Sequence, residues 1–176
     1  MEQRIRESTD NLVSMVCYPE LERVNALERD LRYYYGPMWR DKQIPSEACN
    51  TYCYRINEIA EKDPYLLIAH HYTRYIGDLS GGQILKGIAS KALDNPVGEG
   101  LHFYDFPQIE DAKAWKDGYR LCLDNMDLNE QQKNAIIVEA NYAFRLNMYI
   151  FDEIQGSATK GFWKVLLATM FPKRGK

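Results

Sequence analysis

Apolar residues recur at intervals of three and four along most of the chain, which is the spacing of one buried helix face. No segment alternates apolar and polar residues as a strand would. Without repeats or an internal linker, residues 1–176 are predicted to form one all-α domain. The predicted helices run from or before Met1 to Val16, from Pro19 to Gly36, from Pro45 to about Ile59, from Asp63 to about Leu93, from Ile109 to Asn125 and from Asn129 to about Gly156, followed by an amphipathic stretch over 162–170.

Glycines interrupt the longest predicted helix at Gly77, Gly81 and Gly82, beside Asp78. Each glycine in a helix interior costs about 1 kcal/mol relative to alanine, so the tract indicates a kink or a close approach to the backbone. Gly77 and Gly81 are one turn apart and share a face. The pattern predicts a bare helix surface against which a flat ligand can lie, with one carboxylate at its edge. Close packing of two helices through small residues is the alternative.

The pentapeptide Leu79–Gln83 also matches the signature sequence of ABC-type ATPases. That interpretation requires a phosphate-binding loop after a strand, ending in lysine. The nearest glycine spacing runs from Gly82 to Gly87, but Ile88 follows where the lysine should stand. The sequence therefore does not support an ATPase.

Composition excludes several classes of protein. The formal charge of −3 gives no reason to expect nucleic acid or an anionic membrane as a partner. No run of about 18 apolar residues predicts a membrane span, and no apolar signal core follows Met1. Four cysteines show no spacing typical of a metal site. We therefore expect a cytoplasmic protein.

The segment Tyr72–Gln83 resembles the distal-helix signature of the heme oxygenases. The resemblance continues in Leu27–Trp39, in Leu66–His70 and in Gly98–Pro107, and it covers the chain from Met1 to about Gly156. The sequence around Tyr34 is most similar to that of the ferredoxin-dependent enzymes of cyanobacteria, plastids and cyanophages. The resemblance implies a helical bundle of the heme oxygenase type with a kinked distal helix.

The function implied by the resemblance is the oxidative cleavage of heme to biliverdin, carbon monoxide and ferrous iron. Heme would be substrate and cofactor, dioxygen the oxidant and reduced ferredoxin the electron donor. Lys86, Lys91, Lys113 and Lys116 are candidates for the ferredoxin contact. The resemblance also implies a downstream bilin reductase as a partner. The location would be the cytoplasm, the plastid stroma or an infected cyanobacterial host.

Site residues follow from the resemblance position by position. Asp78 would be catalytic, because a carboxylate can order water and pass protons without binding iron. Lys116 and Arg120 would pair with the heme propionates, since buried carboxylates need cationic partners. The full set expected to contact heme is Tyr72, Gly77, Ser80, Gly81, Gly82, Lys116, Arg120, Phe144, Asn147 and Phe151. For Phe144 and Phe151, ordinary core packing is nearly as good an interpretation.

One departure concerns the iron ligand. Heme oxygenases hold iron through a histidine on a first helix, which would precede Met1. The chain is therefore expected to be truncated relative to the family, and to start inside a helix. His70, His71 and His102 are expected to be structural, so no residue is assigned to the metal. The alternative function is a truncated, catalytically impaired remnant that binds heme or a partner protein. A thiaminase-like bundle would need a cysteine nucleophile with a carboxylate, and neither can be assigned.

Overall fold

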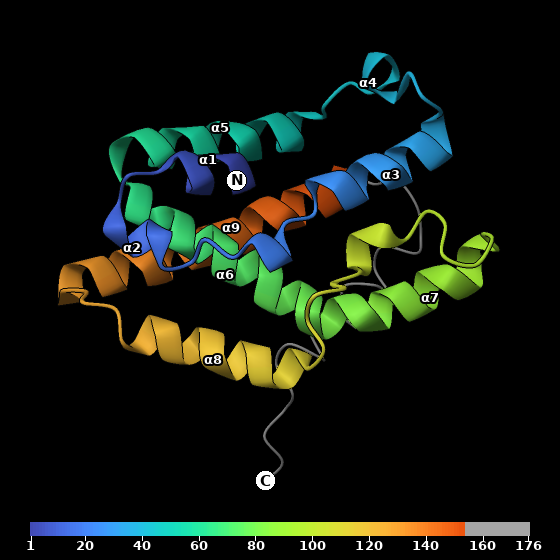
Figure 1. Cartoon of the computed structure of the whole chain (residues 1–176). Coiled ribbons are helices and arrows are strands. Elements are labelled where there is room, and N and C mark those ends of the chain that lie inside the picture. Colours follow the sequence, from blue (N-terminus) through green and yellow to red (C-terminus); the bar gives the residue numbers. More distant parts are fainter. Residues whose placement is uncertain (154–176) are drawn as a thin grey trace, which may run out of the picture.

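The computed structural model describes residues 1–153, which form helices and turns with no strand among them (Figure 1). The prediction of an all-α fold is confirmed. The elements are α1 (Glu2–Glu7), α2 (Asn11–Ser14), the 3₁₀ turn η1 (Pro19–Leu21), α3 (Val24–Tyr35), α4 (Trp39–Lys42), α5 (Glu47–Lys62), the 3₁₀ turn η2 (Pro64–Leu66), α6 (Leu67–Gly77), the π segment η3 (Asp78–Gly82), α7 (Gln83–Leu93), the 3₁₀ turn η4 (His102–Tyr104), α8 (Ala112–Asp124) and α9 (Glu130–Glu153). The stretch 162–170 and the end near Gly156 lie outside the described residues, and a single domain over 1–176 stays a prediction.

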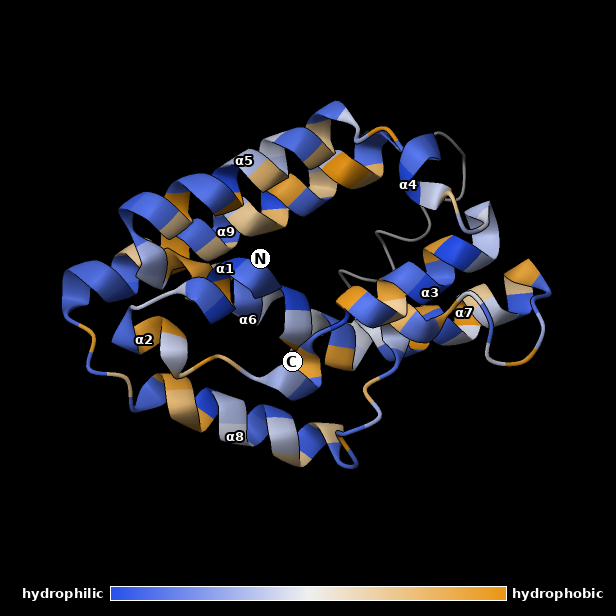
Figure 2. Cartoon of the chain, turned by 45° about the horizontal axis from the view of Figure 1, so that its top comes forward, coloured by the Kyte–Doolittle hydropathy of each residue, from blue (hydrophilic) through white to orange (hydrophobic). Residues whose placement is uncertain are grey.

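Helix α6 lies at the centre of the described bundle, with α9 packed against both α5 and α6. Leu67, Ile68 and Tyr75 of α6 are each at most 1% exposed and belong to three different core clusters. One cluster joins α6 to α1 and α5, the second to α8, and the third to η1 and η3. Polar and apolar residues alternate in short stretches along the helices, as amphipathic packing requires (Figure 2).

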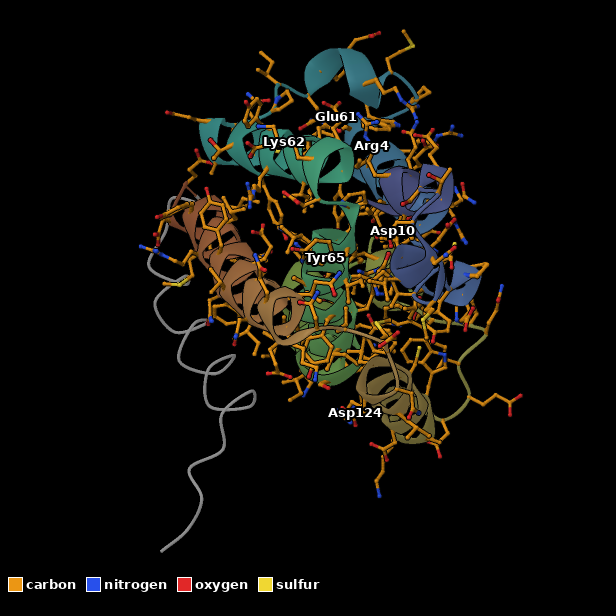
Figure 3. All side chains as sticks on the ribbon, turned by 90° about the vertical axis from the view of Figure 1, so that its left-hand side faces the viewer. Arg4, Asp10, Glu61, Lys62, Tyr65 and Asp124 are labelled. Carbon is orange, nitrogen blue, oxygen red and sulfur yellow. The ribbon has the colours of Figure 1, made fainter. Side chains whose placement is uncertain are left out.

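The predicted first helix is interrupted, contrary to expectation. It ends at Glu7, and a second short helix begins after Asp10. The Asp10 carboxylate accepts hydrogen bonds from the backbone N–H groups of Leu12 and Val13, at 2.8 and 3.1 Å. An aspartate that caps backbone donors in this way starts a helix rather than continuing one. Helix α1 instead packs on α5, where Arg4 donates to Asn57 at 2.8 Å. Arg4 also forms an ion pair of 3.9 Å with Glu61 of α5 (Figure 3).

The second helix begins later than predicted. Pro19–Leu21 forms only a 3₁₀ turn, and α3 starts at Val24 with Arg23 as its N-cap. The backbone N–H of Arg23 donates to Oε1 of Glu2, at 3.0 Å. This long-range bond and the complete burial of Leu21 keep the chain out of helical geometry between η1 and α3.

Other helix starts follow the capping signals in the sequence. Ser46 accepts a hydrogen bond from the N–H of Cys49 and begins α5. Asn129 and Gln132 exchange hydrogen bonds of 2.8 and 3.1 Å, a capping box before α9. Helix α8 begins at Ala112, slightly after the predicted Ile109, because Asp111 caps it.

The glycine tract does not break the predicted long helix but widens it. Residues Asp78–Gly82 form a π segment between α6 and α7, and Gly77 and Gln83 on either side keep right-handed helical dihedrals. The helix changes direction at this segment (Figure 1), so the predicted kink is confirmed. Such π segments are frequent at functional sites. No described helix is both long and apolar enough to span a membrane.

Candidate functional site

The carboxylate of Asp78 pairs with Arg23, a residue distant in the sequence. Nη2 of Arg23 lies 2.8 Å from Oδ2 of Asp78, and the two side chains are 3% and 15% exposed. The contact is an ion pair without hydrogen-bond geometry, since Oδ2 and the Arg23 Nε have no hydrogen-bond partner among the described residues. The π segment thus carries a carboxylate that forms an ion pair with a buried cation.

Three aromatic rings enclose the Arg23 guanidinium. Its central carbon lies 4.8, 4.4 and 5.0 Å from the ring centroids of Tyr75, Phe103 and Phe106. Burial, with the adjacent Glu2 carboxylate, raises the pKa of Tyr75, whose hydroxyl donates to Oε1 of Glu2 at 2.7 Å. Sequence reasoning missed Arg23 and Glu2, because neither belongs to a motif and both reach the site through tertiary packing.

The glycines of the tract differ in their surroundings. A Cβ atom on Gly77 would have no described atom within 4 Å beyond its own helix and neighbours. A Cβ on Gly82 would contact Asp78 Cβ at 3.4 Å and Tyr104 Cδ1 at 3.6 Å, and Gly81 is buried. Within residues 1–153, then, no second helix packs closely on Gly77. The bare backbone there is compatible with a flat ligand.

Of the two cations predicted on α8, one reaches the π segment. Nζ of Lys116 donates to Oγ of Ser80, at 2.8 Å, whereas Nη1 of Arg120 donates to Asp117 on its own helix, at 2.9 Å. Lys116 is half-buried and Arg120 is exposed. The structure therefore brings Lys116 and Ser80 together and gives Arg120 a local partner.

The remaining predicted residues lie on α6 and α9. Tyr72 is half-buried and stacks on Tyr119, with ring centroids 6.1 Å apart. Asn147 accepts from Nη2 of Arg74 at 2.6 Å and donates to the hydroxyl of Tyr52 at 3.3 Å. Phe144 and Phe151 are half-buried on α9.

All three histidines of the chain have bonded ring nitrogens. Nε2 of His70 is 2.8 Å from Glu139, Nδ1 of His71 is 2.7 Å from the Tyr119 hydroxyl, and Nδ1 of His102 is 2.8 Å from Asp30. Burial, and then the charge of Arg23, lowers the pKa of His71 to about 3, so this ring is neutral at physiological pH. No group of three or more potential ligands within 1–153 could hold a metal ion.

Two features define the class of protein: an all-helical bundle built around a glycine-bearing helix, and a carboxylate on that helix that is paired with a buried arginine. The chain belongs to the heme oxygenase family, whose model, described as "Heme oxygenase", matches residues 1–153. The heme oxygenase of Guillardia theta is 43% identical over 177 residues, covering 100% of this chain and 75% of that protein. That of Rhodella violacea is 47% identical over 88% of this chain and 66% of its own length.

Solved structures agree with this family. Heme oxygenase-1 from Synechocystis sp. PCC 6803, in complex with heme, superposes with a TM-score of 0.84 at 39% identity, covering 96% of this chain and 76% of that one. Heme oxygenase-2 from the same cyanobacterium, in complex with heme and NO, gives 0.83 at 40% identity, covering 95% and 67%. The chain thus spans about two thirds to three quarters of these relatives.

Proposed function

We propose that this protein binds heme and cleaves it oxidatively to biliverdin, carbon monoxide and ferrous iron. Dioxygen would be the oxidant and reduced ferredoxin the electron donor. Membership of the heme oxygenase family supports the reaction, and the two Synechocystis relatives were solved as heme complexes. Bound heme would supply both the ring to be opened and the iron that activates dioxygen.

The residues of the π segment and α8 fit such a ligand. The macrocycle would lie against the backbone at Gly77 and Gly81, where a side chain on Gly77 would project into space free of described atoms. Lys116 and Arg120 would pair with the propionates, because two carboxylates leaving water need cationic partners. The other residues proposed to contact heme are Tyr72, Ser80, Gly82, Phe144, Asn147 and Phe151.

Asp78 would order water at the reacting edge of the ring and pass protons through it. A carboxylate suits this task, because it accepts hydrogen bonds from water in two directions and exchanges protons readily. The single observation that carries the proposal is the position of Asp78. Its carboxylate forms an ion pair with Arg23. Asp78 lies on the π segment that includes Ser80, and it comes directly after Gly77, whose face is open.

Partners and location follow from the same proposal. A reduced ferredoxin would dock on a loose basic surface that includes Lys91 and Lys113. Lys86 forms an ion pair with Asp105, which leaves it less available. A bilin reductase would consume the product. The protein would act in the cytoplasm, the plastid stroma or an infected host.

A second candidate is a heme-binding or partner-binding protein with impaired catalysis. The observation that favours it is the bonding of His70, His71 and His102, each through at least one ring nitrogen. Iron coordination by any of them would require breaking these contacts or using the remaining nitrogen.

A heme titration followed by turnover distinguishes the two functions. Purified protein is titrated with hemin, with and without free imidazole, and the visible spectrum is recorded. Addition of ferredoxin, its reductase, NADPH and air should then convert bound heme to biliverdin if the proposed function is correct. Tight heme binding without biliverdin, also in the presence of imidazole, would favour the second candidate. Absence of heme binding would contradict the proposal and favour a partner-binding role.

A further inference from the structure

The Asp78 carboxylate has a partner that local sequence does not suggest. Arg74 stands one helical turn before Asp78, where an i, i+4 ion pair forms most readily. Its guanidinium instead donates to Asn147, at 2.6 Å. Within residues 1–153, the cation paired with Asp78 is Arg23, from the start of α3.

The Arg23 side chain is fixed from several directions. Its guanidinium lies within 4.4 to 5.0 Å of three ring centroids, and Nη1 donates to the carbonyl oxygen of Phe103 at 3.5 Å. Its backbone N–H donates to Glu2. Because only 3% of the side chain is exposed, water screens the charge weakly and its attraction for a carboxylate is strong. Arg23 is thus a rigid cation rather than a surface partner.

This arrangement gives the Asp78 carboxylate a defined orientation. Oδ2 is buried and faces the Arg23 guanidinium, whereas Oδ1 takes no part in the ion pair and has no hydrogen bond within residues 1–153. One oxygen is therefore held by the protein, and the other is left to accept hydrogen bonds from molecules outside it. A carboxylate without the cation could rotate, and the water it orders would lose its fixed position.

We propose that Arg23 is a positioning residue, which orients the Asp78 carboxylate for proton delivery without touching heme itself. This inference rests on the proposed function, in which Asp78 is the group that moves protons. The inference predicts different effects on heme binding and on catalysis. Loss of Arg23 should slow heme cleavage and leave heme affinity nearly unchanged.

The first test needs neither heme nor activity. Thermal unfolding of the heme-free protein is compared for Arg23→Met, Asp78→Asn and the double variant. Arg23→Met should lower Tm by roughly 5–10 °C, because it leaves a nearly buried carboxylate unpaired. The double variant should recover at least half of this loss. Strictly additive shifts would overturn the inference, since they would mean that the two side chains do not act on each other.

The second test measures heme affinity and cleavage rate in the same variants. Arg23→Met should bind hemin within about threefold of wild type and form biliverdin at least about tenfold more slowly. Arg23→Lys should recover part of the rate, and the double variant should be no slower than Asp78→Asn. Arg6→Met is the matched control, because it breaks an arginine–carboxylate pair with Glu22 at the surface.

Two outcomes would count against the inference here. Unchanged turnover in Arg23→Met, or a further tenfold loss when Arg23→Met is added to Asp78→Asn, would show that Arg23 does not act through Asp78. If wild type itself forms no biliverdin, the proposed function fails. The unfolding cycle then still decides whether Arg23 holds the carboxylate.

Discussion

Nε2 of His70 lies 2.8 Å from Oε1 of Glu139, and this contact joins α6 to α9 inside the bundle. Arg55 of α5 donates to both oxygens of the same carboxylate, at 2.9 and 2.6 Å. One buried carboxylate therefore connects three helices. Burial alone would raise the pKa of Glu139, but the hydrogen bonds from Arg55 and His70 outweigh it and lower the pKa to about 2.

Replacing this carboxylate should destabilise the protein in a pH-dependent way. Because its pKa is lower in the folded than in the unfolded chain, Glu139 stabilises the fold above pH 4.5 and loses this effect as pH falls toward 2. We expect Glu139→Gln to cost about 2–3 kcal/mol at pH 7, measured by urea unfolding, and the difference from wild type to shrink in acid. Glu130→Gln, at an exposed pair on the same helix, is the control. A difference that does not change with pH would contradict the assignment.

His71 should make the fold sensitive to mild acid. Its pKa is about 3 in the folded protein and 6.5 ordinarily, so the unfolded chain binds a proton first as pH falls. Stability should therefore decrease below pH 6.5, by at most about 1.4 kcal/mol per pH unit from this group. His71→Gln should remove that part of the slope between pH 6.5 and 4. An unchanged slope in the variant would assign the acid sensitivity to other groups.

Gly77 and Gly87 offer a matched pair of substitutions. A Cβ on either would meet open space, so Gly77→Ala and Gly87→Ala should each leave stability unchanged or raise it by up to about 1 kcal/mol. Only Gly77→Ala should weaken hemin binding, because only that methyl group would stand between the helix and the macrocycle. Equal hemin affinity in both variants would place the ligand elsewhere.

Lys116 should recognise the propionates of heme. We expect Lys116→Ala to weaken hemin binding about tenfold, the effect of losing one charge-assisted contact. Binding of heme dimethyl ester, which lacks the carboxylates, should change little. Lys113→Ala on the same helix is the control, since this exposed residue is not among those proposed to contact heme. A similar loss for both ligands would mean that Lys116 acts through Ser80 rather than through the propionates.

Asp78→Ala should separate binding from chemistry. Removing the carboxylate leaves the glycine face intact, so hemin affinity should stay within a few fold of wild type. Biliverdin formation should fall by about 100-fold or more, the usual contribution of a positioned proton donor or acceptor. Turnover is followed as the appearance of biliverdin absorbance in the ferredoxin-coupled assay. Unchanged turnover would exclude Asp78 from the reaction.

The helices were predictable because their signals are local. Apolar spacing marks the buried faces, and Ser46 and Asn129 cap helices from within three residues. The cost of the glycine tract predicted the kink in the long helix for the same reason, since helix propensity depends on each residue alone. The Asp10 cap is also a local signal, but the apolar spacing on both sides of it favoured the prediction of one uninterrupted helix.

The choice of partners depended on packing between distant segments. Local spacing favours Arg74 as the partner of Asp78, yet the guanidinium that reaches it comes from Arg23. The periodic pattern likewise could not say that Arg120 pairs on its own helix while Lys116 reaches Ser80. The spacing of apolar residues along the chain specifies which residues share a face of a helix. Which buried charges meet across that face is determined by how the helices pack, because desolvation makes each unpaired charge costly.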